Sequence, residues 1–461
     1  MMTQLRLSGA QHRALRAHLL PDDGMEAVAI AFCGRLHVGD HHVLCVHDLV
    51  MVPYDACTER TPLRVSWPTS MLVPHMEKAI RRGLAVLKIH SHRGDYRFFS
   101  QVDDDSDRDL FRSVYGWFDG DAPHASAVML PNGEIFGRVV ADNGGFDPLH
   151  SVSVAGDDFH FWPVGTAAEP LPGFTQRHAQ VFGQGTTARL RMLSAAVIGC
   201  SGTGSPLIEQ LVRLGIGKLV LVDPDVVEEK NLNRILHATM EDAQARRPKV
   251  EVMAREINRI GLGTNVVPLQ KNLVDPDTVR QVAVCDVVFG CMDGAEGRNL
   301  LNRLATFYCL PYFDVGVRLE ADGQGGVSQV CGGVHYLQPG GSSLISRGVI
   351  APEDIEAEAL RRSDPDEYER RFKVGYIRGI REDRPAVISV NMHFASMAVN
   401  EFLARLHPFR DDTNSGYSWT STSLTQMQSY AKADGQACLR LAKHVGRGDM
   451  NPLLDMPILS E

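Results

Sequence analysis

Residues 195–225, AAVIGCSGTGSPLIEQLVRLGIGKLVLVDPD, decide the fold of the second half of this chain. An apolar run typical of a buried strand leads into a glycine turn, an amphipathic helical stretch and a second apolar run. Gly199, Gly202 and Gly204 permit a tight turn and a close approach of phosphates to the helix N-terminus. Asp223 ends the second run, about 20 residues on, where it can bind ribose hydroxyls. The pattern predicts a nucleotide-binding unit, and taken alone it suits a dehydrogenase equally well.

Strand-like and helix-like segments alternate across residues 173–410, which predicts an α/β domain with a Rossmann-like, mostly parallel, doubly wound sheet. Residues 1–150 carry short β-type runs and the hairpin signal Asn132-Gly133, so we expect a separate mixed α/β domain. A helix is expected over residues 1–21, ending near Pro21. Residues 151–172, with three prolines, are predicted to be a linker, and residues 411–461 a C-terminal tail.

Composition restricts the class of protein. The 461 residues are 44% apolar and 22% charged, as in globular proteins, and no apolar stretch approaches the roughly 18 residues needed to cross a bilayer. The nine cysteines form no C-x-x-C pair, which favours reduced thiols in a cytoplasm. The net charge of −9 disfavours nucleic acid as the main partner. We therefore expect a cytoplasmic protein that binds neither membrane nor nucleic acid.

A metal-ligand pattern lies in the first half of the chain. His90 and His92 are one residue apart at the end of a predicted strand, so their rings point to the same side. Asp103, brought back by the intervening loop, can add an oxygen ligand. Three protein ligands and one open position describe a catalytic zinc site. The neighbouring Asp104, Asp105, Asp107 and Asp109 are interpreted as a solvated helix start.

The pattern H-S-H-x7-S-x-x-D, which includes Ser100, resembles that of the JAMM (JAB/MPN) metalloproteases. Members of this family hydrolyse peptide or isopeptide bonds next to ubiquitin-like proteins. The resemblance implies that Glu26, at the head of the run EAVAIAF, is the general base. It also implies that Ser100 donates a hydrogen bond to the tetrahedral oxyanion.

The segments DPDVVEEKNLNR (223–234), RRPKV (246–250) and VVFGCMDGAEGRNLLN (287–302) resemble the adenylation domain of ubiquitin-activating enzymes and their ThiF/MoeB/HesA relatives. The resemblance covers residues 177–320 and implies a homodimer that uses ATP and Mg²⁺. It assigns the ribose to Asp223, the phosphates to Asn231, Arg234 and Lys249, and Mg²⁺ to Asp293, with Arg298 in support. QRHAQVFG (176–183) resembles the segment that sends an arginine into the partner's ATP site, which here would be Arg177.

The chain departs from this family in two places. The glycine loop has Ser201 where the family has glycine, which is tolerable if that residue does not need positive φ. Many relatives hold a structural zinc with two C-x-x-C pairs and carry a catalytic cysteine on a crossover loop. Here LQPGGSSLISRG (337–348) has serines, and residues 332–437, including the expected crossover loop at 372–386, contain no cysteine. The structural zinc is therefore expected to be absent.

Two alternatives remain for the acyl group. The enzyme stops at the acyl-adenylate and hands it to an acceptor, or a cysteine elsewhere takes it. Cys438 is the leading candidate, because Arg440, Lys443 and His444 follow it and could lower its pKa. A small buried hydrophobe on a C-terminal helix is the simpler interpretation of this residue.

The two resemblances together imply a bacterial enzyme that processes and activates a ubiquitin-like protein, cutting after its C-terminal glycine and adenylating that glycine. A conjugating enzyme or acceptor protein would be a further partner, and analogy with conjugation operons suggests a role in antiphage defence. One alternative is a biosynthetic enzyme that adenylates a sulfur carrier or a peptide. Another is a degenerate adenylation fold that serves as a docking platform for the peptidase.

Overall fold

The computed structural model describes residues 2–164, 171–373 and 385–460. The chain divides into two compact units. Unit 1 contains Met1–Glu169, Thr306–Cys309 and Lys443–Asp455, and unit 2 contains Pro170–Ala305, Leu310–Ala442 and Met456–Glu461. Within the described ranges, no helix has the length and apolar composition needed to span a bilayer.

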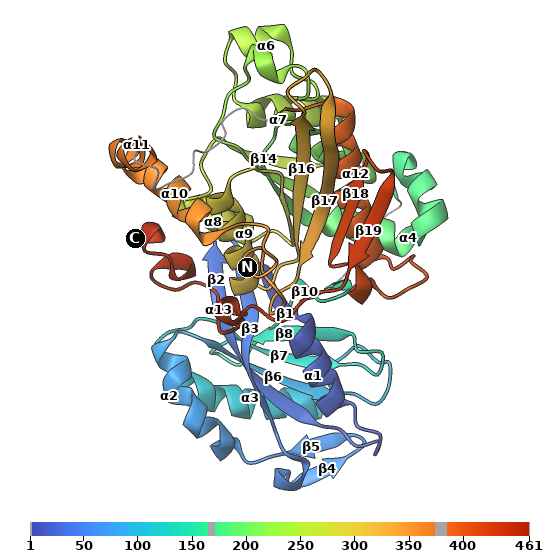
Figure 1. Cartoon of the computed structure of the whole chain (residues 1–461). Coiled ribbons are helices and arrows are strands. Elements are labelled where there is room, and N and C mark those ends of the chain that lie inside the picture. The colour runs from blue at the N-terminus through green and yellow to red at the C-terminus, as the bar shows by residue number, and fades with distance from the viewer. Residues whose placement is uncertain (1, 165–170, 374–384, 461) are drawn as a thin grey trace. The chain divides into compact units, whose positions relative to one another are not determined.

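Unit 1 is built on a nine-stranded mixed sheet in the order β11-β10-β1-β3-β2-β6-β7-β8-β9. Figure 1 labels β1, β2, β3, β6, β7, β8 and β10 of this sheet. Antiparallel hairpins β2–β3 and β7–β8 account for much of it, and β6 pairs parallel to β7. The strands are β1 (Met2–Ser8), β2 (Val28–Val38), β3 (His41–Met51), β6 (Ala85–Ser91), β7 (His124–Met129), β8 (Ile135–Val140), β9 (Phe146–Pro148), β10 (Ser151–Ala155) and β11 (Phe159–Pro163). A separate pair is formed by β4 (Glu59–Thr61) and β5 (Arg64–Ser66).

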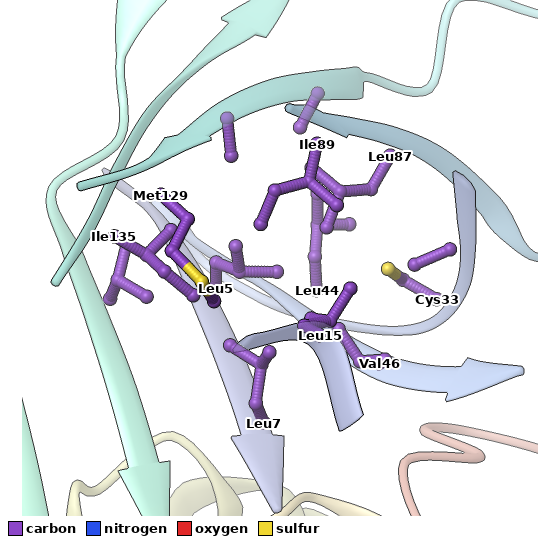
Figure 2. Close-up of a cluster of buried hydrophobic side chains, with 14 of the residues drawn as sticks. Leu5, Leu7, Leu15, Cys33, Leu44, Val46, Leu87, Ile89, Met129 and Ile135 are labelled. Carbon is purple, nitrogen blue, oxygen red and sulfur yellow. The ribbon is translucent and has the colours of Figure 1, made fainter. Parts of the chain in front are cut away.

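Successive residues of β2 bury on opposite faces of this sheet. Ala29 and Ala31 join a cluster with Leu15 of helix α1 (Gly9–Leu19), part of which Figure 2 shows. Ile30 and Phe32 join a second cluster, with side chains of α2 (Val73–Arg81) and α3 (Gln101–Tyr115). Burying one leucine, isoleucine or phenylalanine side chain in these clusters stabilises the fold by about 1.5–3 kcal/mol. Because the first six residues of β2 are all apolar and successive side chains point to opposite faces, both faces are apolar and both are covered by helices.

Two sequence predictions for unit 1 are wrong. Residues 2–8 form β1 rather than the start of a helix, because Leu5 and Leu7 alternate with polar residues; Ser8 then caps α1 through a capping box. The predicted linker 151–172 contains β10 and β11, which extend the sheet from β1. The alternating sequences SVSV and FHF are typical of strands, but the three prolines in this segment favoured the prediction of a linker.

Unit 2 has an eight-stranded sheet in the order β14-β13-β12-β15-β16-β17-β18-β19. The first five strands are parallel to one another, and the last three continue antiparallel, which confirms the Rossmann-like α/β prediction. The strands are β12 (Ser194–Ile198), β13 (Lys218–Val222), β14 (Asn265–Leu269), β15 (Val287–Gly290), β16 (Tyr312–Ala321), β17 (Val327–Leu337), β18 (Trp419–Ser423) and β19 (Gln428–Lys432).

The chain order reverses at β12, with β13 on one side of it and β15 on the other. In open α/β sheets a ligand crevice forms at the carboxyl ends of the strands that flank such a switch point. The helices of unit 2 are α4 (Gln176–Met192), α5 (Gly204–Leu214), α6 (Met240–Gln244), α7 (Lys249–Ile260), α8 (Pro276–Ala283), α9 (Ala295–Phe307), α10 (Pro352–Ser363), α11 (Pro365–Lys373), α12 (Ile388–Leu406) and α13 (Leu439–Ala442).

Residues 411–461 are not a tail. They supply β18 and β19 to the sheet of unit 2, and residues 443–455 belong to unit 1, where the Gly34 amide donates to the Gly446 carbonyl. The two strands lack a strong apolar alternation, because their side chains are half-buried or exposed. Backbone pairing and the neighbouring β17, rather than a hydrophobic pattern, define them.

Candidate nucleotide and metal sites

The turn between β12 and α5 depends on glycine. Gly199 has a φ of +93°, and a Cβ there would lie 2.6 Å from the Cys291 carbonyl oxygen. A Cβ on Gly204 would lie 1.8 Å from the Gly199 carbonyl oxygen. Ser201 is not among the described non-glycine residues with positive φ. The loop therefore needs glycine at 199 and 204 and accepts serine at 201.

Asp223 follows β13 and is buried beside this turn. Its Oδ2 accepts the Cys200 amide at 2.7 Å, and its Oδ1 accepts the Asp225 amide at 2.9 Å. Burial raises the pKa of this carboxyl. Lys249 Nζ lies 2.7 Å from Asp225 Oδ2 and 3.8 Å from Asp223 Oδ1, so one lysine connects the two carboxylates.

A cavity of about 790 Å³ opens at the carboxyl ends of β12, β13 and β15. It brings together most residues that the sequence predicts for the nucleotide: Gly199, Asp223, Asn231, Arg234, Lys249 and Asp293. Gly202 lines an adjoining cavity of about 390 Å³ instead. The sequence reasoning missed Arg246 and Lys271, which also line the larger cavity. Lys271 comes just after β14, so its strand-end position was the available signal.

Local hydrogen bonds fix two of the predicted phosphate-binding side chains. The Asn231 Oδ1 accepts the Glu228 amide at 3.1 Å across a 3₁₀ turn, η4 (Glu229–Asn231). The Arg234 Nη1 donates to the Lys230 carbonyl at 2.9 Å and to Asn233 Oδ1 at 3.0 Å. The half-buried guanidinium is thus oriented at the cavity wall by its own turn.

Other predicted residues lie away from this cavity. Arg177 is exposed on α4, within 3.5 Å of Gln180, and its role in a partner's site stays a prediction. Arg298 pairs with the buried Asp314, at 2.8 Å from Nε to Oδ1, and Tyr312 donates to the same carboxylate. This ion pair connects α9 to β16, and the supporting role of Arg298 stays a prediction.

Serines replace cysteines where the structural zinc of relatives was expected. Arg347 Nε donates to Ser342 Oγ at 2.7 Å, and Arg347 Nη2 lies 2.9 Å from Asp434 Oδ1. Ser343 and Ser346 bond to each other's amides at 2.8 and 3.0 Å. This donor set does not fit Zn²⁺, because an arginine occupies it and hydroxyls are poor ligands. An ion pair joins these loops instead.

Cys438 is 9% exposed and starts a short turn into α13. Its amide donates to the Gly341 carbonyl at 2.9 Å. It lines a separate cavity, with Trp419 and Arg440, and is absent from the linings of both cavities beside the glycine loop. The predicted crossover loop at 372–386 lies largely outside the described residues.

His90, His92 and Asp103 come together in unit 1. One ligand atom from each lies within 4.8 Å of the others. His90 Nε2 is 3.0 Å from Asp103 Oδ1, and His92 Nε2 is 3.7 Å from Asp103 Oδ2. Both imidazoles are 2% exposed, and burial lowers the pKa of His90. Burial opposes ionisation of Asp103, but the two adjacent histidines and the hydrogen bond from Ser100 hold its pKa below the usual value. A neutral imidazole and a carboxylate suit Zn²⁺.

Glu26 and Ser100 flank this cluster. Val28 pairs with His90 across β2 and β6, so Glu26 precedes that register and lies toward His92. Glu26 is 4% exposed, and burial raises its pKa to about 7. Ser100 Oγ donates to Asp103 Oδ2 at 2.7 Å and accepts the Asp103 amide, forming a capping box at the start of α3. The predicted oxyanion role requires that this hydroxyl leave Asp103.

The interpretation of the acidic run as solvated is wrong for Asp107. Its side chain is 0% exposed and accepts Lys88 Nζ at 2.7 Å and Arg138 Nη2 at 2.7 Å. Although burial opposes ionisation, the two cations hold the pKa of Asp107 below its usual value. Arg138 also pairs with Asp104. These bonds tie α3, which carries Asp103, to β6 and β8.

Comparisons with known proteins concern mainly unit 2. The ThiF family model matches residues 175–438. Ubiquitin-like modifier-activating enzyme 5 of Drosophila persimilis is 30% identical over 189 residues, and that of Aedes aegypti 28% over 188 residues. These matches cover 38% of this chain and 46% and 45% of the relatives, so the chain spans about half the length of the relatives it matches. E. coli MccB with MccA-N7isoASN aligns at a TM-score of 0.46 and 17% identity, over 59% of this chain and 75% of that one. The chain belongs to the ThiF family.

Proposed function

We propose that unit 2 adenylates the C-terminal glycine carboxylate of a ubiquitin-like protein with Mg-ATP. The observation that carries this proposal is one cavity that combines the glycine loop with Asp223, Arg234, Lys249 and Asp293. Attack of a carboxylate on the α-phosphate needs in-line positioning and cationic charge rather than a strong base. The relatives' names refer to ubiquitin-like modifiers, which supports this substrate class.

Each side chain has a role in this mechanism. The carboxylate of Asp223 binds the ribose hydroxyls while its backbone hydrogen bonds hold the glycine loop. Arg234 and Lys249 bind the phosphate oxygens and offset the charge that grows on the departing pyrophosphate. Asn231 orients the same phosphates from its 3₁₀ turn. Asp293 would hold Mg²⁺, which supplies further positive charge to the phosphates when bound.

We further propose that the acyl-adenylate passes directly to an acceptor. Cys438 is buried and lines a cavity that shares no lining residue with the nucleotide cavity, which disfavours a thioester there. The alternatives are a thioester on Cys438 and a biosynthetic enzyme for a sulfur carrier or peptide. The intact cavity disfavours a degenerate docking platform.

For unit 1 we propose a JAMM-type metallopeptidase that cuts after the same glycine. Convergence of His90, His92 and Asp103, with Glu26 buried beside them, supports it. Zn²⁺ bound to these three residues would polarise the scissile carbonyl and activate a water. Glu26 accepts the proton of that water and returns it to the leaving amine. A cytoplasmic, homodimeric enzyme of a bacterial conjugation system would combine both activities.

The test is ATP–pyrophosphate exchange with a ubiquitin-like partner encoded by a neighbouring gene. We expect exchange by the wild-type protein and its loss in Lys249→Ala, with Arg213→Ala on the exposed face of α5 as the matched control. Exchange that is absent from the wild type, or undiminished in Lys249→Ala, would contradict the proposal. For unit 1, cleavage of a carrier extended beyond its glycine should require Glu26 and should disappear in Glu26→Gln.

A further inference from the structure

The smaller cavity next to the glycine loop is not explained by nucleotide binding. Its volume is about 390 Å³, and five residues of its wall also line the nucleotide cavity: Ser201, Lys230, Arg234, Cys291 and Asp293. Val315, Val317, Pro385, Ala386 and Asn391 line only the smaller one. The two spaces therefore meet at Arg234 and Asp293, where the proposed chemistry occurs.

Two helices begin at this cavity. Thr203, the N-cap of α5, lines it, and so does Ala386, the residue before the N-cap Val387 of α12. Neither N-cap side chain makes a capping hydrogen bond. Because residues at both N-termini line the cavity, the positive ends of the two helix dipoles face the same space. Backbone N–H groups at such ends favour an anion.

Asn391, in the first turn of α12, gives a second and independent indication. Its side chain is 6% exposed, and among the described residues its Oδ1 has no hydrogen-bond partner. A Cβ on Gly202 would lie 2.2 Å from Asn391 Nδ2 and 2.9 Å from Arg234 Cδ. Because residue 202 is glycine, the side chains of Asn391 and Arg234 can lie directly against the glycine loop. A buried carbonyl oxygen without a donor is costly, so its partner is expected to come from a ligand.

We propose that Asn391 is a positioning residue that accepts the amide N–H of the substrate's terminal residue. This inference rests on the adenylation proposed above. The N-terminus of α12 favours the carboxylate, next to the phosphate that Arg234 binds. One carboxylate oxygen bonds to the α-phosphorus as the bond from that phosphorus to the bridging oxygen breaks and pyrophosphate leaves. The peptide N–H lies two bonds from the carboxyl carbon. Fatty acids and side-chain carboxylates lack a donor there, so the site selects a chain-terminal peptide carboxylate.

Two synthetic peptides test this assignment by pyrophosphate exchange. One ends in Gly-Gly with a free carboxylate, and the other replaces the last glycine with N-methylglycine, which removes the N–H. We expect the wild type to exchange about tenfold less with the N-methyl peptide, as for one lost hydrogen bond. Asn391→Ala should lose about tenfold with Gly-Gly, in KM for the peptide, and should no longer distinguish the two peptides.

Two further readouts separate positioning from structural support. Asn391→Ala should bind Mg-ATP within about twofold of the wild type and should melt no earlier, because alanine favours helix and removes an unsatisfied oxygen. Asn400→Ala, exposed on the same helix, is the control and should change nothing.

The outcomes distinguish two failures. Equal exchange with both peptides by the wild type would overturn the role of Asn391, whereas no exchange with either peptide would count against the adenylation on which that role rests. A lower melting temperature with weakened Mg-ATP binding in Asn391→Ala would also overturn it, in favour of a structural role. Failure of the wild type to bind Mg-ATP would overturn the proposed adenylation itself.

Discussion

The candidate metal site of unit 1 and the nucleotide cavity of unit 2 are built in opposite ways. The metal ligands lie within 14 residues of sequence, from His90 to Asp103, and a buried ion network fixes the helix that carries the third. The nucleotide cavity gathers residues from Ile198 to Glu358 at the ends of several strands. A local motif thus defines one site, and sheet topology defines the other.

This difference has a physical consequence. Asp103 depends on a few strong, buried contacts around α3, so single substitutions there should unsettle unit 1 itself. The nucleotide cavity is open and polar, and Arg234 on its wall is oriented by short-range contacts within its own turn. Substitutions there should cost activity and leave the fold intact.

The independence of the two sites is tested most strongly by His92→Ala. We expect the wild type to retain about one zinc per chain and the variant none, because two ligands cannot replace three. Metal content by mass spectrometry and pyrophosphate exchange are measured on the same samples. His160→Ala, exposed in the same unit, is the control. Zinc that persists in His92→Ala would place metal elsewhere, and lost exchange would show that the sites are coupled.

The buried ion network should give the largest loss of stability. Asp107→Ala leaves Lys88 and Arg138 buried without their shared carboxylate, which should cost about 3–5 kcal/mol of unfolding free energy. Urea unfolding followed by tryptophan fluorescence reports on unit 1, which holds three of the four tryptophans. Asp109→Ala removes a carboxylate that is 80% exposed and should stay within about 0.5 kcal/mol. Equal losses of unfolding free energy in Asp107→Ala and Asp109→Ala would contradict a special role of the buried ion network in stabilising unit 1.

In unit 2, Arg234→Ala should lower activity without lowering stability. We expect about a 100-fold fall in pyrophosphate exchange, close to 2.7 kcal/mol of barrier, from one lost cation at the reacting phosphate. The unfolding curve should stay unchanged, since the guanidinium's hydrogen bonds within the described part of the chain go to Lys230 and Asn233 of its own turn. Arg213→Ala controls for loss of a surface arginine. A stability loss matching the activity loss would mean that Arg234 supports the fold instead.

The features that could be predicted from the sequence are those set by local spacing, and the features that could not are contacts between distant segments. The glycine turn, Asp223 and the His90–Asp103 cluster were accessible because each depends on local spacing. The burial of Asp107 was not, since its partners Lys88 and Arg138 lie on separate strands and a run of aspartates looks solvated. Asn391 was equally hidden, because its contact with Gly202 arises only when α12 packs against α5.

Of these substitutions, Ser100→Ala should have the smallest effect on stability. It also tests whether a residue close to Asp103 in the sequence controls zinc binding. Ser100→Ala removes the N-cap of α3, which should cost about 1 kcal/mol. It also removes the hydroxyl that orients Asp103, so we expect zinc affinity to fall about tenfold. Ser113→Ala, exposed on the same helix, should alter neither quantity.

The pattern of loss for Ser100→Ala identifies what this hydroxyl does. A role confined to the oxyanion would lower peptide hydrolysis and leave zinc affinity and unfolding free energy at their wild-type values. A role in orienting Asp103 lowers zinc affinity first, and hydrolysis at saturating zinc then recovers, because the remaining ligands still hold the metal. The hydroxyl has one proton, which Asp103 accepts at 2.7 Å, so the second result is the one that this geometry favours.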